Sequence, residues 1–558
     1  HKSHLLLVPS GELQRTVADD AQHTLPNFRQ GDAIVLYERN ADTDNVTNKM
    51  VFKGNIDYLN ENEICIRLRA TQQNSSVLPS DSLYAIEHDA MDTTFRSMYQ
   101  GLYAFMSATK ERRDLLLSQR EPQFDVALDK QIAEAADDFT RIALKAKAAK
   151  DYFLLVGPPG TGKTSCALKK MVETFYKEEG AQILLLSYTN RAVDEICKAL
   201  SSIRPEVDFI RVGSELSCDE NYRDHLIENE LATCMRRTEV CERINRCRIL
   251  VGTVASISGK PELFRLKHFD VAIVDEATQI LEPQLLGILC AKGENGKEGV
   301  GKFILIGDHK QLPAVVLQNT EQSEVYDEAL SAVGLKNLKD SLFERLYRTA
   351  RQHTDAHRTY DMLCRQGRMH PEVALFANQA FYEGRLLPVG LPHQLEDSGN
   401  INRLSFYPSQ PEPMGSSAKT NHSEAKIAAR LAATVYKEHS EAFDASRTLG
   451  IITPYRSQIA LIKKEIEVLG ISELNQILID TVERFQGSER DVIIYSFCVN
   501  YPYQLKFLSN LTEEDGILID RKLNVALTRA RKQMLLTGVP TLLERNPLYK
   551  SCLLYTSP

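Results

Sequence analysis

The chain has 558 residues, of which 43% are hydrophobic and 25% are charged, and it contains no tryptophan. This length is roughly three to four times that of a typical domain, so we expect several domains with sizeable cores. The composition is that of a globular protein and excludes collagen-like, mucin-like and wholly disordered chains. The net charge of −8 excludes a histone-like polycation, although it is compatible with a local basic groove.

The start of the chain and its apolar runs bear on localisation. The sequence opens on His1 and has no basic-then-apolar segment of the signal-peptide type. The longest apolar runs, such as residues 153–156, are strand-sized and fall far short of the roughly 18 to 20 residues of a membrane span. We therefore expect a monomeric fragment of a cytoplasmic protein without a membrane partner, nucleoid-associated in a bacterium or nuclear in a eukaryote.

Residues 28–90 alternate short β-rich runs with clusters of turn-forming residues. We predict strands at residues 33–37, 49–56 and 63–69, separated by loops at residues 40–48 and 71–82. This pattern predicts a small β-barrel. The preceding leader, residues 1–27, gives no clear structural signal.

Residues 91–150 are rich in Glu, Lys, Arg, Leu and Ala, and after Gly101 they contain no Gly or Pro except Pro122. This texture predicts two long helices, forming a stalk or an antiparallel pair.

From residue 151 onward, apolar strand-like runs alternate with amphipathic helical segments. The first series of strands is expected at residues 151–156, 182–187, 208–212, 248–254, 270–274 and 302–306. A second series is expected at residues 449–453, 476–480, 492–497 and 533–537. Two such series predict an α/β fold of two doubly wound domains, residues 151–348 and 349–545, followed by a C-terminal tail, residues 546–558. The Gly-, Lys- and Glu-rich residues 291–301 are interpreted as a surface loop.

A glycine-rich segment follows the first of these strands and opens a helix, the context of a phosphate-binding P-loop. The glycines let backbone N–H groups surround phosphate oxygens, and the helix N-terminus adds positive potential. Lys163 would neutralise β- and γ-phosphate oxygens, and the Thr164 hydroxyl can bind Mg²⁺. The segment predicts binding of a nucleoside triphosphate by Gly157, Pro158, Pro159, Gly160, Thr161, Gly162, Lys163 and Thr164.

Two later strand ends carry polar groups suited to hydrolysis. Asp275 and Glu276 end an apolar strand, where Asp275 can hold the metal and Glu276 can orient and deprotonate a water. Gln311 follows another strand, and its neutral amide can bond both the γ-phosphate and the attacking water. Because Glu276 implies water as the nucleophile, we expect a hydrolase rather than a kinase.

Two further clusters contain residue types that can bind metal ions. Cys218, Cys234, Cys241 and Cys247 lie close in sequence but contain no Cys-x-x-Cys pair, so free thiols are favoured over a metal or iron–sulfur site. His353 and His357 have the spacing of two zinc ligands, but no Glu follows His353, so two ordinary polar residues are favoured.

Taken in order, these segments resemble superfamily 1 helicases of the 5′→3′ branch. The similar subgroup contains the nonsense-decay (up-frameshift) helicase, senataxin and the nuclease-helicase of Okazaki-fragment processing. The resemblance covers about residues 151–539. Besides the P-loop, the acid pair and the Gln311 segment, it rests on residues 187–194, 251–256, 366–371, 381–384, 453–458, 485–491 and 523–531.

The resemblance implies two RecA-like domains with ATP in the cleft between them and a single strand across their tops. The first domain would supply the P-loop residues with Asp275, Glu276 and Gln311. The second would supply two arginine fingers, Arg368 and Arg529, while Gly487 and Glu489 would line the same cleft near the phosphate and ribose. Residues 28–90 and 91–150 resemble the family's accessory barrel and stalk in order and size.

The resemblance also implies the partners. A single strand of DNA or RNA would be contacted by hydroxyls, amides and a ring, the groups used for backbone contact and stacking. DNA is favoured, because residues 151–164 and the compact barrel resemble the nuclease-helicase relatives, and a nuclease domain would have to precede His1. The implied contact residues are Thr189, Asn190, Thr253, Pro454, Tyr455 and Thr481.

The sequence departs from the family at the base of the nucleotide. Gly367 stands where relatives commonly place a tyrosine that stacks on adenine. The adenine-reading glutamine is also not evident, since Phe139 and Thr140 stand near its expected place and Gln131 comes several residues too early. Nucleoside triphosphates other than ATP are therefore expected to be accepted.

We accordingly predict an ATP-dependent 5′→3′ translocase and helicase that uses ATP and Mg²⁺. The alternative is a nucleotide-gated clamp or remodelling subunit that binds nucleic acid without unwinding it. The hydrolytic set Glu276, Gln311, Arg368 and Arg529 favours the motor over the clamp.

Overall fold

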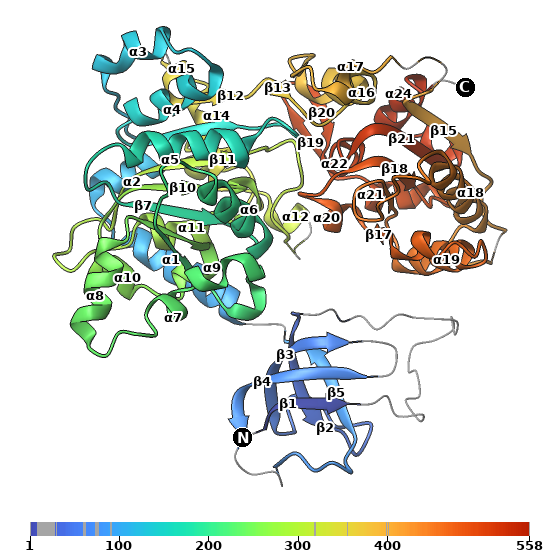
Figure 1. Ribbon diagram of the computed structural model, residues 1–558, viewed down its shortest axis with the longest axis horizontal. Helices are drawn as coiled ribbons and strands as arrows, with labels where there is room; N and C mark the ends of the chain where they lie inside the picture. Colours follow the sequence, from blue (N-terminus) through green and yellow to red (C-terminus); the bar gives the residue numbers. More distant parts are fainter. Residues whose placement is uncertain are drawn as a thin grey trace. The chain divides into compact units, whose positions relative to one another are not determined.

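The computed structural model describes residues 2–7, 28, 31–59, 63–72, 77–89, 92–316, 318, 320–353, 355–397, 399, 401–413 and 415–556. The chain forms two units, residues 1–96 and residues 97–558 (Figure 1). No helix in the described ranges is long and apolar enough to cross a membrane.

The first unit is built on an antiparallel sheet with the strand order β1-β4-β3-β2-β5. Alternate residues of two strands, Ile34 and Leu36 in β2 and Ile66 and Leu68 in β4, belong to one apolar cluster, as the two-residue period of a strand requires. The strands are β1 Lys2–Leu7, β2 Ala33–Glu38, β3 Val51–Leu59, β4 Ile64–Gln72 and β5 Tyr84–His88.

The three strands expected between residues 28 and 90 are present within a few residues of their predicted bounds. The sequence did not predict β5, nor β1, which lies within the expected leader and pairs with β4. Residues 8–27, the rest of that leader, lie outside the described residues. Among the described strands β1 and β5 are the two edges of the sheet, so closure into a barrel stays a prediction.

The expectation of two long helices in residues 91–150 is wrong, because four shorter helices are present. Pro122 interrupts the helical pattern after α2, and the next residue, Gln123, uses its backbone N–H to bond the Asp151 carboxylate (2.7 Å). Asp137 starts a new helix by accepting from the Thr140 N–H (2.9 Å). The helices are α1 Asp92–Met106, α2 Lys110–Leu116, α3 Asp129–Ala133 and α4 Asp138–Ala148.

The second unit contains two lobes, which we define as the first lobe (residues 97–363) and the second lobe (residues 364–556). The first lobe holds a wholly parallel sheet in the order β12-β6-β11-β10-β7-β9-β8. Its strands are β6 Tyr152–Val156, β7 Ile183–Ser187, β8 Phe209–Val212, β9 Ile249–Thr253, β10 Phe269–Val274, β11 Val300–Gly307 and β12 Tyr360–Met362.

Both faces of this sheet are buried, which explains why its strands are continuous apolar runs. Tyr152, Leu154 and Val156 of β6 belong to one apolar cluster, whereas Phe153 and Leu155 belong to the cluster on the other face. α2 packs into the first cluster and α4 into the second, so both of these helices from the predicted stalk are part of the first lobe.

Helices cover each face of the first sheet (Figure 1). α1 approaches α11 so closely that a Cβ on Gly101 would lie 1.8 Å from the Pro283 carbonyl oxygen, which only glycine permits. The remaining helices of this lobe are α5 Lys169–Tyr176, α6 Asn190–Ser201, α7 Ile227–Glu230, α8 Arg237–Arg246, α9 Val254–Ser258, α10 Glu262–Leu266, α11 Glu282–Leu289, α12 Thr320–Ser323, α13 Glu328–Ala332, α14 Leu342–Ala350 and α15 Ala356–Thr359.

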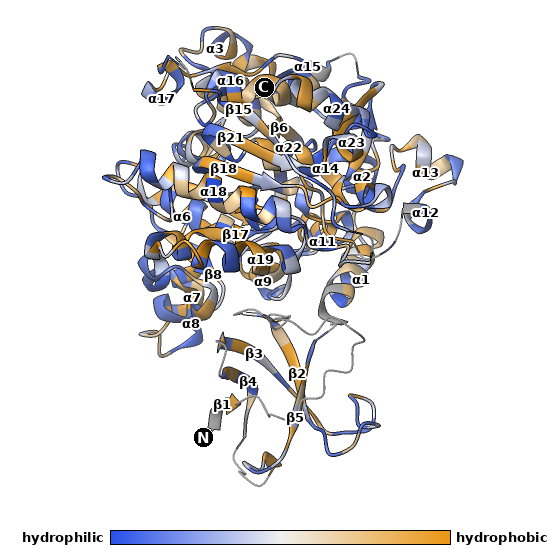
Figure 2. Cartoon of the chain, turned by 90° about the vertical axis from the view of Figure 1, so that its right-hand side faces the viewer, coloured by the Kyte–Doolittle hydropathy of each residue, from blue (hydrophilic) through white to orange (hydrophobic). Residues whose placement is uncertain are grey.

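The second lobe holds a parallel sheet in the order β15-β21-β18-β16-β17. Its central strands β18 and β21 are largely hydrophobic, and apolar clusters bury them (Figure 2). The strands are β15 Leu404–Pro408, β16 Leu449–Ile452, β17 Leu478–Asp480, β18 Arg490–Ser496 and β21 Ala530–Gly538, with the short pairs β13 Arg365–Gln366 and β14 Leu387–Pro388, and β19 Leu511–Glu514 and β20 Ile517–Asp520.

Helices also surround this second sheet. They are α16 Pro371–Tyr382, α17 Pro392–Leu395, α18 His422–Glu438, α19 Arg456–Glu467, α20 Val482–Phe485, α21 Leu505–Leu508, α22 Arg521–Leu527, α23 Pro540–Leu543 and α24 Pro547–Leu554.

Two segments differ from the predicted domain plan. β12 lies beyond residue 348, where the sequence places the end of the first domain, yet it pairs with β6. The expected C-terminal tail forms α24, whose Tyr549 and Cys552 are buried in the second lobe. Tyr549 also donates to the Asp520 carboxylate (2.9 Å), so this segment belongs to the core.

Candidate nucleotide cleft and strand-facing edges

The glycine-rich loop after β6 has the backbone conformation that phosphate binding requires. The φ angles of Gly160 (+73°) and Gly162 (+77°) lie in the left-handed region that favours glycine. The Thr161 hydroxyl closes the loop by donating to the Pro158 carbonyl oxygen (2.7 Å). A π-helical turn, Lys163–Leu168, follows and continues into α5, so the predicted strand, loop and helix succession is present.

Lys163 and Thr164 meet the two acids at the carboxyl end of β10. Lys163 Nζ lies 3.3 Å from Glu276 Oε1. Thr164 Oγ1 donates to Asp275 Oδ2. A cation, a hydroxyl and two carboxylates therefore converge at the ends of β6 and β10, and oxygen donors of this kind suit a magnesium ion beside phosphates.

The surroundings of Asp275 and Glu276 shift the pKa values of the two acids in opposite directions. Burial and the neighbouring Glu276 charge raise the pKa of Asp275. Burial acts in the same direction on Glu276, but the Lys163 ammonium outweighs it and holds the pKa of Glu276 below its usual value. Glu276 also has a φ of +53°, a conformation that a non-glycine residue adopts at some cost. The strand end thus holds Glu276 ionised and directed at Lys163.

Gln311 and Arg529 meet across the two lobes. The Gln311 amide donates through Nε2 to Asp308 Oδ2 (2.7 Å), and its Oε1 accepts from Arg529 Nη2 (3.3 Å). Burial, with the nearby Arg368 charge, lowers the pKa of Arg529 to about 9, which leaves the guanidinium charged at neutral pH. A buried cation of the second lobe therefore lies against an amide of the first.

Arg368 has a different set of partners. Its Nε donates to Glu489 Oε2 (2.6 Å) within the second lobe, and despite burial this contact lowers the pKa of Glu489. The preceding residue, Gly367, donates its N–H to the Gly160 carbonyl oxygen (2.8 Å), so the Arg368 segment lies on the P-loop. Gly487, in the left-handed region at φ +77°, ends the turn before Glu489.

The predicted nucleic-acid residues of the first lobe lie at the carboxyl ends of two strands: Thr189 and Asn190 follow β7, and Thr253 is the last residue of β9. The Thr189 hydroxyl caps α6, which begins at Asn190, and the Thr253 hydroxyl caps α9. Because carboxyl ends of parallel strands share one edge of a sheet, these residues lie along the same edge as the P-loop.

The predicted nucleic-acid residues of the second lobe follow β16 and β17. Pro454 and Tyr455 come after β16, and Thr481 comes directly after β17. The Tyr455 hydroxyl accepts from Gln504 Nε2 (3.1 Å), which fixes its ring.

The second lobe separates the two groups of predicted site residues. Glu489 and Arg529 come directly before β18 and β21, at the amino ends of these strands. Pro454, Tyr455 and Thr481 lie at the carboxyl ends of neighbouring strands. In this lobe the residues that face the cleft and the residues predicted to contact nucleic acid therefore lie at opposite ends of the same parallel sheet.

The structure shows which side chains lie near the expected position of the nucleotide base, where the sequence departs from the family. A Cβ on Gly367 would lie 3.2 Å from Leu391 Cδ1, so an aliphatic side chain stands beside that position. A Cβ on Gly162 would lie 3.6 Å from Phe139 Cζ, which places the Phe139 ring at the P-loop. Gln131 is exposed on α3. Phe139 is therefore a candidate for base contact that lies beside the loop.

No group of three or more His, Cys, Asp or Glu residues in the described part of the chain is arranged to hold a metal ion. Cys218 and Cys247 are buried, and Cys247 Sγ donates to the Ile249 carbonyl oxygen (3.2 Å). His353 lies 3.3 Å from the Glu121 carboxylate.

Three residues near Gln311 are Asp308, Tyr382 and Asn524. Each lies in a segment that resembles a family motif, but the sequence alone indicates no role for them. The Tyr382 hydroxyl donates to Asp308 Oδ2 (2.6 Å), and Asn524 Nδ2 donates to the Tyr382 hydroxyl (2.8 Å). Tyr382 ends the amphipathic helix α16, where a sequence pattern predicts only a core position.

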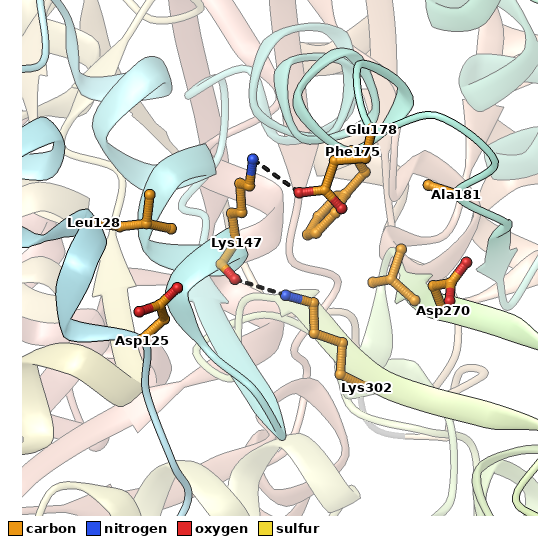
Figure 3. A pocket seen from close by; sticks show the side chains of 9 residues that line it. Asp125, Leu128, Lys147, Phe175, Glu178, Ala181, Asp270 and Lys302 are labelled. Atoms are coloured by element: carbon orange, nitrogen blue, oxygen red, sulfur yellow. Dashed lines mark hydrogen bonds and ion pairs between the residues drawn. The ribbon is translucent and has the colours of Figure 1, made fainter.

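A cavity of about 170 Å³ lies at the opposite, amino-terminal edge of the first sheet (Figure 3). Burial lowers the pKa of Lys302 there to about 8. Its ammonium donates to three carbonyl oxygens at the end of α4, those of Ala146, Lys147 and Ala149. With its donors used in this way, Lys302 closes the α4 terminus and takes no part in the cleft.

Comparisons with known proteins agree with this geometry. One family model described as an AAA domain matches residues 133–240 and 229–319, and a second model with the same description matches residues 338–541. The first match lies within the first lobe, and the second covers the end of the first lobe and most of the second lobe.

Relatives extend the likeness. "DNA replication ATP-dependent helicase/nuclease DNA2" of Bos taurus is 27% identical, over 94% of this chain and 49% of that protein. The protein of the same name from Xenopus laevis is 29% identical, over 86% and 46%. "DNA polymerase alpha-associated DNA helicase A" of Saccharomyces cerevisiae is 26% identical, over 73% and 65%. The chain spans about half the length of the DNA2 relatives. It belongs to the superfamily 1 helicases, in the group of the up-frameshift and DNA2 helicases.

Proposed function

We propose that the chain is an ATP-dependent helicase and translocase that moves 5′→3′ along single strands, with DNA favoured over RNA. The observation that carries this proposal is the meeting of Arg529 with Gln311 across a cleft that also holds Lys163, Asp275 and Glu276. The preference for DNA is supported by relatives whose names describe DNA replication and DNA helicases.

ATP and Mg²⁺ fit the donor set of the cleft. Thr164 Oγ1 and Asp275 Oδ2 are already held together, a hydroxyl and a carboxylate that would bind the ion. The P-loop, residues 157–164, would hold the phosphates, with Gly487 and Glu489 near the ribose. When bound, the magnesium nucleotide supplies the phosphoanhydride bond to be broken.

The side chains of the cleft divide the remaining work. Glu276, kept ionised by Lys163, accepts the proton of the attacking water, and Gln311 orients that water. Arg368 and Arg529 stabilise the charge that develops on the transferred phosphoryl group. Arg529 reaches that position only when the lobes are together, so hydrolysis is tied to lobe motion.

We also propose the domain plan that accompanies this function. The first and second RecA-like domains would correspond to the first and second lobes, residues 97–363 and 364–556, with residues 28–90 as a barrel. A single strand, held by a monomer, would contact the backbone-reading groups at the carboxyl ends of the strands, namely Thr189, Asn190, Thr253, Pro454, Tyr455 and Thr481.

Strand displacement tests this proposal. DNA and RNA duplexes with either a 5′ or a 3′ single-stranded tail are incubated with ATP and Mg²⁺, and the released strand is measured. We expect release from 5′-tailed DNA at the highest rate, and none with Glu276→Gln. Absence of release from every substrate, with ATP still hydrolysed, would contradict the helicase and favour the clamp.

A further inference from the structure

A chain of hydrogen bonds begins in the second lobe, passes through the Gln311 amide of the first lobe, and ends at Arg529 of the second lobe. Asn524 Nδ2 donates to the Tyr382 hydroxyl (2.8 Å), which donates to Asp308 Oδ2 (2.6 Å). The same carboxylate oxygen accepts from Gln311 Nε2 (2.7 Å), and Gln311 Oε1 accepts from Arg529 Nη2 (3.3 Å). We call these five residues the interlobe relay.

Every member of the interlobe relay is buried, with 6% or less of its surface exposed. Buried polar groups are costly when unpaired, so the surrounding contacts determine their orientation. Asn524 is anchored on the first lobe by a second donation, to the Lys310 carbonyl oxygen (2.7 Å). Burial and the Asp308 charge raise the pKa of Tyr382 well above its usual value, so its hydroxyl keeps its proton.

The relay has a direction that decides how the Gln311 amide is turned. A carboxylate accepts hydrogen bonds but does not donate them, so Asp308 Oδ2 binds the NH₂ end of the amide and turns the carbonyl end toward Arg529. Asp308 Oδ1 is already used by the Lys310 N–H (3.1 Å), which holds the carboxylate in place. Tyr382 supplies the second donor to Oδ2, and it comes from the other lobe.

We propose that Tyr382 is a positioning residue that couples lobe closure to the orientation of Gln311. The inference rests on the proposed function. When the lobes are together, the Tyr382 hydroxyl holds the Asp308 carboxylate that binds the NH₂ end of the Gln311 amide. Arg529 donates directly to the carbonyl end of the same amide. When the lobes part, both contacts are lost together, and Gln311 no longer presents a defined face to the attacking water.

The test is the change Tyr382→Phe, which keeps the ring in the core and removes only the hydroxyl. Strand-stimulated ATP hydrolysis is measured to obtain kcat and KM. We expect kcat to fall about tenfold or more, the size of effect of one hydrogen bond to a charged group, with little change in the KM for ATP. The matched control is Tyr495→Phe, because Tyr495 is buried in the same lobe and its hydroxyl has no hydrogen-bond partner among the residues that the structure describes.

A double-mutant cycle shows whether Tyr382 acts through Gln311. In a Gln311→Ala background, Tyr382→Phe should cause no further loss of kcat, because the group that it positions is absent. A full additional loss would assign the effect to general destabilisation and overturn the inference. Thermal unfolding of each variant is followed in parallel, and Asn524→Ala, which removes the donor to the Tyr382 hydroxyl, serves as a second variant with an expected fall in kcat.

The outcomes separate the inference from the proposed function. Wild-type protein that hydrolyses ATP in response to single strands, together with a Tyr382→Phe variant of equal kcat, would overturn the inference alone. Wild-type protein without any turnover would overturn both. A selective fall in kcat that disappears in the Gln311→Ala background would support the assignment.

Discussion

At the scale of single residues, Lys163 and Glu276 form an ion pair, and the proposed function gives them different tasks. Lys163→Ala should abolish turnover because the phosphate clamp is lost. Glu276→Gln keeps the shape of the side chain and removes the base, so it should bind ATP and fail to hydrolyse it. Nucleotide titration and turnover measurements separate the two defects, and near-normal turnover by Glu276→Gln would remove that residue from its proposed role.

Arg529 and Arg368 are expected to act on the transition state rather than on the bound nucleotide. Changing either to Ala should lower kcat roughly 10³-fold or more, with nucleotide affinity far less affected. Arg430→Ala, which removes an exposed arginine of α18, is the control for loss of positive charge. A variant of Arg368 or Arg529 with full kcat and weakened binding would show that the residue contacts the nucleotide only in the ground state.

The base of the nucleotide is expected to be held loosely, because Gly367 offers no ring. A lost stacking contact is worth about 1 to 3 kcal/mol in nucleic-acid complexes. We therefore predict that GTP, CTP or UTP supports strand-stimulated hydrolysis within about tenfold of ATP, which corresponds to about 1.4 kcal/mol. The specificity constants kcat/KM of the four triphosphates test this. A preference for ATP beyond about a hundredfold would indicate that another residue reads the base, and Phe139→Ala would then be the variant to examine.

At the scale of helices and strands, the sequence predicted best those elements that have a clear local pattern of apolar residues. The ten strands expected after residue 150 are present, and most of them are apolar runs whose residues are buried. β12 was missed, since Tyr360–Met362 is short and half-buried, and only its pairing with β6 makes it a strand. The two long helices expected before residue 150 are absent, because Pro122 interrupts the helical pattern and Asp137 caps the start of a new helix.

α18 carries a buried acid whose effect on stability should depend on pH. Glu424 is fully buried, and this raises its pKa to about 7, although Ser496 Oγ (2.7 Å) and the Cys498 N–H (2.8 Å) donate to it. Between pH 4.5, the usual value, and pH 7 the unfolded chain loses the proton and the folded chain keeps it. The contribution of Glu424 to stability is therefore complete below this window and declines by about 3 kcal/mol as pH rises through it.

The neutral variant Glu424→Gln removes this linkage. The unfolding temperature of the variant minus that of wild type should be higher at pH 7.5 than at pH 4.5 by roughly 6 °C or more. This size follows because 1 kcal/mol shifts the unfolding temperature of a domain of this size by about 2 to 4 °C. Thermal unfolding of both proteins at the two pH values measures the difference. A difference that stays constant, or that changes in the opposite direction, would contradict a raised pKa for Glu424.

At the scale of the whole second unit, short motifs predicted candidate cleft residues but not the contacts between them. The P-loop and the acid pair lie in one lobe, and short motifs placed them together. The contact of Arg529 with Gln311 joins residues 218 positions apart, and the relay through Tyr382 depends on three separate elements. Such contacts follow from the packing of two sheets, which local pattern does not encode.

Directional translocation tests the central claim most directly, because a clamp can hydrolyse ATP without moving. A single-stranded DNA with biotin at one end is loaded with streptavidin, and release is followed after ATP is added. We predict ATP-dependent release from the 3′ end, several-fold faster than from the 5′ end, and none with Arg529→Ala. Hydrolysis of ATP without release from either end would contradict the motor, and faster release from the 5′ end would contradict its direction.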